Sequence, residues 1–409
     1  MIMAREKSLK EFPRKPFGLF LSAINDRTLI LLVVITTLIY APIYYYRIHF
    51  PVDSDFSSHM LFTRYLIHGN FNQIPAHILA HPGLQVFLAG LYFLSLHKVS
   101  IGILLTFILT ASHVLTGGII YIWLGSALKR HWDTGRAILA GTLTIVAPLM
   151  LFIFRDNLYY FGYVALANYH NPTIIFLRPF ALISFLLGVR AFTGINNSWK
   201  LILSSGILVL ISAFIKPNYL LCILPALLIL TVWWKVQHKI VDLRYLVFGF
   251  FLPSILVLGV EWWIAYHSPD SDASHIIFSL VGVESAYSRY LLPKFLLSIL
   301  FPLIILAFDF GKLRNNPVLL LALIGFMVAA VQLYFLAESG NRFYDGNFRW
   351  GAQVMLFLWF VVSARELLNK LFDGNKFHLK KIVLSGIYLS HLAAGIAYYV
   401  YCFLSTTYA

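Results

Sequence analysis

Residues 29–46, LILLVVITTLIYAPIYYY, contain no charged side chain over one uninterrupted apolar stretch. An apolar helix of about 20 residues matches the roughly 30 Å thickness of the hydrocarbon core of a bilayer. Ten more strongly apolar runs follow, near 101–127, 137–154, 173–193, 201–215, 219–234, 245–266, 293–309, 317–336, 350–364 and 382–403. The first stretch is therefore interpreted as one membrane span among many.

The composition of the whole chain supports this interpretation. Of its 409 residues, 60% are hydrophobic and only 12% are charged, and a soluble fold could not bury so much apolar surface. Helices are the structures that satisfy backbone groups within such spans. The sequence predicts an all-α polytopic membrane protein with about 11 transmembrane helices, in a single transmembrane domain over 1–409. Cys222 and Cys402 both lie in apolar runs, so no disulfide framework is expected.

The positions of the basic residues orient these spans. Residues 83–96 form a further apolar run, but it is short for a crossing. If it does not cross, most of the 31 Lys and Arg residues share one side with the N-terminal segment 1–28, as the positive-inside rule requires of the cytoplasmic side. We therefore expect a cytoplasmic N-terminus and an interfacial helix at 83–96, within a first external loop over 47–100. The net charge of +14 then needs no nucleic-acid partner.

The loops predicted to be external carry the polar side chains that could perform chemistry. Residues 53–59, DSDFSSH, directly follow the first span. Asp55 and His59 are four positions apart and share a face if 56–68 is helical, with Asp53 just upstream. Such a group can act as a general base or hold a divalent cation. A helix N-cap with solvated neighbours is the structural alternative.

Further candidates follow along the chain. Asp156 lies between two spans, and His170 and Asn171 begin the fourth one. Arg178 lies about two turns into that span, where a charge is costly unless it pairs, lines a wet cavity or snorkels to the headgroups. Lys216 stands before a proline in a break between two apolar runs; a plain turn with a snorkelling lysine is the alternative.

Residues 338–350, ESGNRFYDGNFRW, form the last polar cluster. Asn341, Arg342 and Arg349 with neighbouring aromatic residues are typical of a surface that binds phosphate and sugar. A structural external loop with an aromatic belt is the alternative. Glu261, beside two tryptophans near the end of its span, is interpreted as an interfacial acid with satisfied hydrogen bonds.

The order of these motifs resembles that of the GT-C class of membrane glycosyltransferases, which includes protein O-mannosyltransferases and bacterial aminoarabinose transferases. The resemblance covers roughly residues 25–235. Asp55, His59 and Gly69 fit the spacing of the family's acidic motif, and 80–84, AHPGL, resembles the element that opens its interfacial helix through His81. Lys216 resembles the lysine in the family's helix break. Asn171 departs from the pattern, because an acid often stands there before the proline.

The resemblance implies a GT-C-like fold and a transferase that moves a sugar from a polyprenyl-phosphate donor to a glycan, lipid or protein hydroxyl, at the periplasmic face of a bacterial inner membrane. Asp55 would be the base, with support from Asp53 and His59, and a divalent metal on these three is left open. Arg178, Lys216 and Arg342 would bind the departing phosphate. Other substrate contacts are expected from His81, Asp156, His170, Asn171, Asn341 and Arg349.

Two other functions remain open at this point. A polysaccharide polymerase or ligase would use the same lipid carriers at the same face, and it would depend on Arg342 and Arg349 more than on Asp55. A transporter or flippase for lipid-linked substrates is the non-enzyme alternative. It predicts inverted repeats and helices broken near the middle of the membrane, whereas the breaks visible in the sequence lie near its outer surface.

Overall fold

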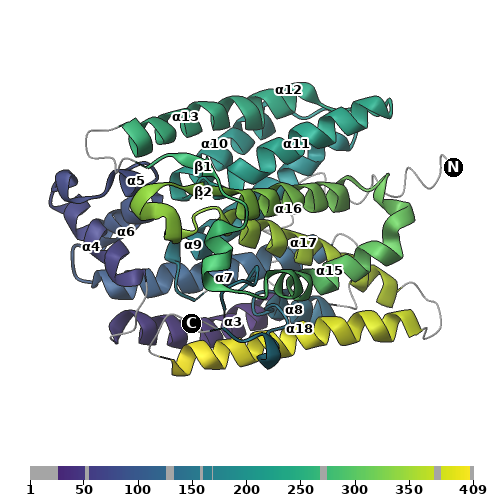
Figure 1. Ribbon diagram of the computed structural model, residues 1–409, viewed down its shortest axis with the longest axis horizontal. Helices are drawn as coiled ribbons and strands as arrows, with labels where there is room; N and C mark the ends of the chain where they lie inside the picture. The colour runs from purple at the N-terminus through teal and green to yellow at the C-terminus, as the bar shows by residue number, and fades with distance from the viewer. Residues whose placement is uncertain are drawn as a thin grey trace.

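The computed structural model describes residues 26–50, 55–125, 133–156, 160–167, 169–267, 274–372 and 379–405. Most of the predicted segment 1–28 and Asp53 lie outside these ranges. The described chain is a bundle of long helices that run side by side (Figure 1). Its strand structure within these ranges is a single pair of three-residue strands, so the prediction of an all-α fold is confirmed.

Within the described residues, nine helical segments are long and apolar enough to cross a membrane. They are α3 (Arg27–His49), α7 (Ile101–Gly125), α9 (Pro172–Val189) with η4 (Arg190–Phe192), α11 (Asn218–Val236), α12 (Leu243–Leu246) continuing through η5 (Val247–Phe251) into α13 (Leu252–His267), α15 (Leu291–Leu313), α16 (Pro317–Phe335), α17 (Arg349–Leu371) and α18 (Leu379–Leu404). The shorter α10 (Trp199–Ile215) is also apolar. A multi-pass membrane protein is thus supported, and the number of about 11 spans stays a prediction.

The predicted span over 137–154 differs most from the structure. Helix α8 (Asp133–Leu143) ends early, and the chain continues without helix until η3 (Phe152–Phe154). Other helices satisfy this irregular backbone, because the Ala147 N–H donates to the His391 carbonyl oxygen of α18 at 3.3 Å. Gly395 of α18 lies against the backbone at Ile145, with no room for a Cβ. Hydropathy alone could not reveal this, since irregular backbone buried among helices has the same apolar composition as a span.

Helix starts follow local sequence signals. Asn171 precedes Pro172 at the start of α9, and its Oδ1 accepts from the Ile174 N–H. Asn316 caps α16 in the same way before Pro317. Asparagine is a favoured N-cap, and proline fits the first helical turn because its missing N–H would have no partner there. These caps fix where the polar connections begin.

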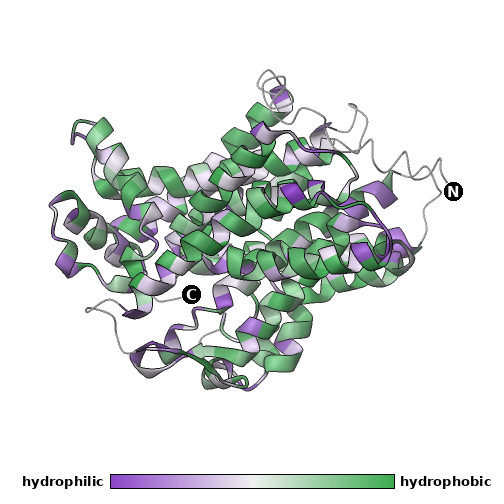
Figure 2. Cartoon of the chain, turned by 90° about the horizontal axis from the view of Figure 1, so that it is seen from above, coloured by the Kyte–Doolittle hydropathy of each residue, from purple (hydrophilic) through white to green (hydrophobic). Residues whose placement is uncertain are grey.

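Burial separates a central helix from peripheral ones. In α17, 94% of the most apolar window is buried within the bundle, against 28% in α3, in α13 and in α18. The peripheral helices therefore expose apolar side chains along their length, as lipid-facing helices do. Figure 2 shows this as hydrophobic green along the helices, with hydrophilic purple mainly in the connections.

Several short elements cover one end of the bundle. Between α3 and α7 lie α4 (Phe56–Ile67), η1 (Phe71–Gln73), α5 (Ala76–Leu79) and α6 (Gly83–Leu94), at the left of Figure 1. Strand β1 (Ile276–Phe278) pairs antiparallel with β2 (Leu336–Glu338), near α14 (Gly282–Tyr287) and η6 (Gly340–Asp345). Most of 56–68 is helical as α4, which was the condition for Asp55 and His59 to share a face, and most of 83–96 is helical as α6, whose interfacial position stays a prediction. Gly83 lies against the backbone at Phe214, so α6 begins beside the end of α10.

Candidate functional site

A cavity of ≈ 770 Å³ lies among these short elements, a volume within the roughly 300–1,000 Å³ of small-molecule sites. It gathers most of the residues that the sequence singled out, from segments far apart in the chain. Those that line it are Asp55, His59, His81, His170, Asn171, Lys216, Arg342 and Arg349. The separate motifs of the sequence are therefore parts of one site.

Asp55 stands at the N-cap position of α4, but its side chain makes no capping hydrogen bond. Its Oδ2 instead accepts from Nδ2 of Asn171 at 2.9 Å. Asn171 uses its other side-chain atom, Oδ1, to cap α9. The structural alternative of a helix cap therefore does not explain Asp55, whose side chain is oriented by a residue 116 positions away.

Lys216 follows α10 directly, in the break before Pro217. Its Nζ donates to Oγ1 of Thr173 at 3.1 Å, and the Thr173 hydroxyl donates to Oδ1 of Asn171 at 2.8 Å. A line of hydrogen bonds thus joins the Lys216 ammonium to the Asp55 carboxylate. Burial lowers the pKa of Lys216 to about 8, and the nearby Asp55 opposes that shift. Nζ also lies 5.2 Å from the centre of the Trp350 ring.

Three imidazoles also line the cavity, those of His59 and His170 buried and that of His81 half-buried. Nδ1 of His59 accepts from Nε2 of Gln85 at 2.7 Å, which fixes the ring between α4 and α6. Burial, and then the charge of Lys216, lower the pKa of His59 to about 3. Burial and neighbouring cations also lower the pKa of His170 to about 3 and that of His81 well below its usual value. All three are neutral at physiological pH and can contact a ligand only as neutral rings.

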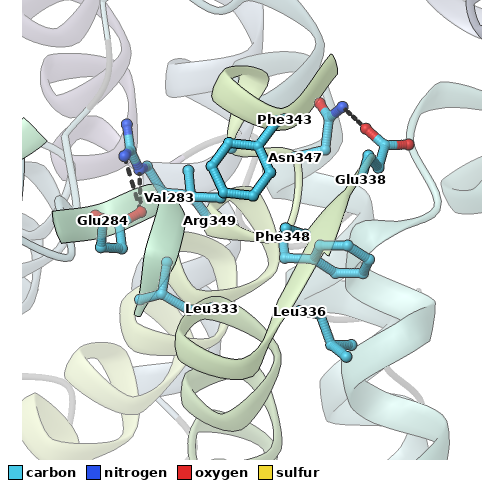
Figure 3. Close-up of a pocket in the computed structure, with 11 residues that line it drawn as sticks. Val283, Glu284, Leu333, Leu336, Glu338, Phe343, Asn347, Phe348 and Arg349 are labelled. Carbon is cyan, nitrogen blue, oxygen red and sulfur yellow. Dashed lines mark hydrogen bonds and ion pairs between the residues drawn. The ribbon is translucent and has the colours of Figure 1, made fainter. Parts of the chain in front are cut away.

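Arg342 reaches the cavity from η6 and is already paired. Its guanidinium lies 3.0 Å from Oε1 of Glu338, and its Nε lies 3.7 Å from Oδ2 of Asp345. Glu338 also accepts from the Tyr266 hydroxyl at 2.5 Å and from the Asn347 amide. Figure 3 shows Glu338 and Asn347 in a smaller adjoining pocket. These contacts join the end of α13 to the connection between α16 and α17.

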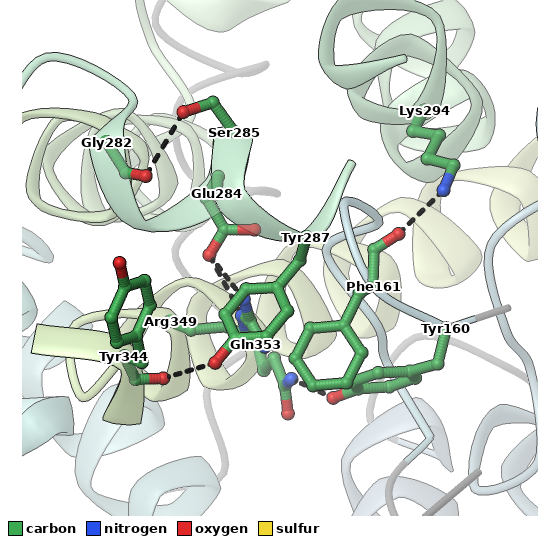
Figure 4. Close-up of polar contacts among 10 residues, drawn as sticks. All are labelled: Tyr160, Phe161, Gly282, Glu284, Ser285, Tyr287, Lys294, Tyr344, Arg349 and Gln353. Atoms are coloured by element: carbon green, nitrogen blue, oxygen red, sulfur yellow. Dashed lines mark hydrogen bonds and ion pairs between the residues drawn. The ribbon is translucent and has the colours of Figure 1, made fainter. Parts of the chain in front are cut away.

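The charge of Arg349, at the start of α17, is neutralised more completely than that of Arg342. Its Nε and one terminal nitrogen donate to Oε1 of Glu284 at 2.9 and 2.8 Å, and both side chains are buried. The guanidinium also lies 4.5 Å from the ring centre of Phe161 and 5.4 Å from that of Tyr287. Figure 4 shows this arrangement, with the Tyr287 hydroxyl donating to the Tyr344 carbonyl oxygen. Arg349 therefore forms a fixed wall of the cavity.

The other candidates lie elsewhere. Asp156 pairs with Nζ of Lys294 at 2.6 Å and accepts from Ser288; burial opposes its ionisation, but these hydrogen bonds lower its pKa. Arg178 is buried in the bundle, where it donates to the Leu166 carbonyl oxygen at 2.6 Å and lies over Phe357, so it does not snorkel. Asn341 is exposed on η6 and does not line the cavity. Asp53 falls outside the described residues.

A divalent metal would need several convergent ligands. Within the described ranges, no three His, Cys, Asp or Glu side chains gather as such a site requires. Asp55 and His59 are instead held by amide side chains, from Asn171 and Gln85 respectively.

Several functional contacts could not be singled out from the sequence. Thr173 lies two positions after Asn171 and donates to it. The one sequence signal for this contact was a threonine hydroxyl at a helix start, where such side chains often bond to near neighbours. Glu284 had no signal, because its partner Arg349 lies 65 positions away. Glu261 differs from its interpretation as a satisfied interfacial acid. It is 5% exposed and lines the cavity, and neither carboxyl oxygen has a hydrogen-bond partner within the described ranges.

In comparisons with known proteins, no protein-family model, no curated protein and no solved structure matches this chain.

Proposed function

We propose that the protein is a membrane glycosyltransferase that moves a sugar from a polyprenyl-phosphate donor to an acceptor hydroxyl. The observation that carries this proposal is the hydrogen-bonded line from Lys216 through Thr173 and Asn171 to Asp55, in the wall of one large cavity. Such a site offers a cation for a phosphate beside a carboxylate that can accept a proton. The resemblance in motif order to GT-C enzymes agrees with this pair.

The proposed reaction uses Asp55 as the general base. Its carboxylate takes the proton of the acceptor hydroxyl while that oxygen forms a bond to the anomeric carbon of the donor. The bond between this carbon and the phosphate oxygen breaks, and the phosphate leaves with the electron pair. Attack from the face opposite the leaving phosphate inverts the anomeric centre. Asn171 keeps Asp55 oriented for the transfer, since it donates to one carboxylate oxygen at 2.9 Å.

Lys216 is the proposed partner of the departing phosphate. Among the described residues, Arg342 and Arg349 each have a carboxylate within ion-pair distance, whereas Lys216 has none. Its charge is therefore available to a ligand without breaking an existing ion pair. Negative charge grows on the phosphate as the bond breaks, so a fixed cation there stabilises the transition state. Arg342 supports the same phosphate from η6 if it exchanges Glu338 for the ligand.

The polyprenyl chain needs an apolar path. The cavity wall includes apolar side chains of α4, α5, α11 and α13, namely Phe62, Ile78, Leu221, Leu258 and Trp262. Helix α13 also exposes apolar side chains on its outer surface, where lipid would lie. These features support entry of the carrier from the bilayer, with the cavity at the external face of an inner membrane as the positions of Lys and Arg predict.

Two observations bear on the alternatives. Arg349 already forms an ion pair with Glu284, so its charge is not free to bind a substrate. This argues against the polymerase or ligase alternative, which depends on this arginine. The non-helical stretch after α8 supports the transporter alternative, because broken helices within the bundle are common in transporters. A transporter moves the lipid-linked sugar without cleaving it, so the two functions differ in the product formed.

The test is transfer of radiolabelled sugar from polyprenyl-phosphate donors by the purified chain, comparing wild type with Asp55→Asn. We expect the variant to lose transfer by at least about a hundredfold, within the range for removal of a general base, while it still binds the donor lipid. Full activity of Asp55→Asn would refute the role of Asp55. Flipping of intact donor across vesicles without release of polyprenyl phosphate would instead support a transporter.

A further inference from the structure

Glu261 is a carboxyl group of the cavity wall that no described part of the chain satisfies with a hydrogen bond. It lies on α13, one turn from Leu258 and beside Trp262, and all three line the cavity. Only 5% of Glu261 is exposed, and neither Oε1 nor Oε2 has a hydrogen-bond partner among the residues that the structure describes. By contrast, Glu338, which also lines the cavity, accepts from Tyr266 and Asn347 and pairs with Arg342.

Such a side chain is unfavourable in the empty protein. A buried carboxylate without a cation costs several kcal/mol, and a buried neutral acid without hydrogen bonds also loses its interactions with water. Leucine or another apolar residue at position 261 would suit a helix that faces the bundle and lipid. A polar group retained at such a cost in a cavity wall is typical of a ligand contact.

The surroundings of Glu261 favour a neutral ligand group. On α13 itself, the wall residues Leu258, Trp262 and Ala265 that flank Glu261 are apolar or aromatic, and the charged groups Asp55 and Lys216 lie on other elements, α4 and the break between α10 and α11. A carboxylic acid in such an environment offers one donor and one acceptor, which a single hydroxyl can match in both senses. Trp262 on the same wall offers an apolar face for a sugar ring.

We propose that Glu261 binds a hydroxyl group of the donor's sugar. This inference rests on the proposed function, because that function places a polyprenyl phosphate at Lys216. The sugar is bonded directly to the phosphate, so it lies in the cavity whenever the phosphate occupies its site. Lys216 then selects the phosphate, and Glu261 distinguishes a lipid that carries a sugar from the bare lipid phosphate that is the product.

The test compares Glu261→Gln and Glu261→Leu with wild type. Binding of polyprenyl phosphate and of polyprenyl phosphates that carry a hexose or a pentose is measured by calorimetry on the full chain in detergent. For Glu261→Leu we expect affinity for the preferred sugar-bearing lipid to fall about tenfold, as for two lost hydrogen bonds, with bare polyprenyl phosphate unchanged. Glu261→Gln keeps one donor and one acceptor, so its affinity should stay within about threefold of wild type.

Thermal unfolding of the variants separates ligand binding from a structural role. Leucine replaces a carboxyl that has no partner, so Glu261→Leu should unfold at the wild-type temperature or above. Val260→Ala, on the exposed surface of α13, is the control for substitution in this helix and should leave binding unchanged.

Three outcomes would overturn the inference about Glu261. They are equal loss of affinity for bare and sugar-bearing lipids, a lower unfolding temperature with the loss, and loss in Glu261→Gln as large as in Glu261→Leu, which would indicate a charged ligand group. A wild-type chain that binds no polyprenyl phosphate at all would instead refute the proposed function itself.

Discussion

The pKa of Lys216 makes the phosphate site sensitive to alkaline pH. Burial lowers this pKa to about 8, so about 90% of the side chains carry a charge at pH 7 and about 10% at pH 9. If the charged form binds the donor phosphate, kcat/KM for the donor should fall about tenfold between these two values. His59 and His170 are neutral throughout this range, because the pKa of each is about 3, and they add no change of charge.

Two variants at this position separate the charge from other causes. Lys216→Arg keeps a charge at every pH of the assay, so its kcat/KM should fall less than that of wild type from pH 7 to pH 9. Lys216→Met removes a charge-assisted hydrogen bond worth about 1.5–3 kcal/mol, which corresponds to a loss of roughly 10- to 150-fold at pH 7. Its residual activity should not vary as Lys216 titrates.

The assay measures initial rates of sugar transfer at low donor concentration, because kcat/KM reports the ionisation of the free enzyme. Thermal unfolding at each pH checks that the protein remains folded. The same decline above pH 8 in Lys216→Arg as in wild type would assign the decline to another group. A wild-type profile that is level to pH 9 would refute the proposal that the Lys216 charge binds the phosphate.

Two further predictions concern the cavity wall and the orientation of the chain. Glu284→Gln leaves the buried Arg349 charge without its partner and should destabilise the fold by about 3–5 kcal/mol, seen as a marked fall in unfolding temperature; an unchanged temperature would contradict the buried ion pair. An Asn341→Cys variant should react with a membrane-impermeant thiol reagent in intact cells, whereas Lys200→Cys, at the other end of the bundle, should not. Both native cysteines, Cys222 and Cys402, are buried and should give little background, and the reverse pattern of labelling would overturn the predicted orientation.

Membrane spans were predictable because their signal is local. A run of about 20 apolar residues can be recognised as a possible span without any other part of the chain. The caps at Asn171 and Asn316 can be recognised from the proline that follows each. The segment after Leu143 could not be predicted in the same way. Its backbone is satisfied by α15 and α18, which lie far along the chain, and its side chains are as apolar as those of a helix.

For the candidate site, the sequence identified which residues gather but not what each one contacts. Asp55, His59 and Lys216 stood out because ionisable groups beside apolar spans are costly. The partners that set their behaviour depend on tertiary contacts. Arg342 and Arg349 seemed equivalent in sequence, yet Arg349 is enclosed by Glu284 and two aromatic rings. Glu261 shows the same limit, since only the packing reveals that none of the described residues donates a hydrogen bond to its carboxyl group.

The amide at position 171 has a consequence for the charge of Asp55. Asn171 donates to the Asp55 carboxylate at 2.9 Å, so an aspartate at 171 would place two acids within hydrogen-bond distance. Two such acids share one proton, because neither can ionise freely beside the other's charge. With asparagine there, position 171 adds no acid beside Asp55 and donates a hydrogen bond to it instead. The residue at which the resemblance to the GT-C pattern fails thus provides a neutral hydrogen-bond donor to Asp55 in place of a second charge.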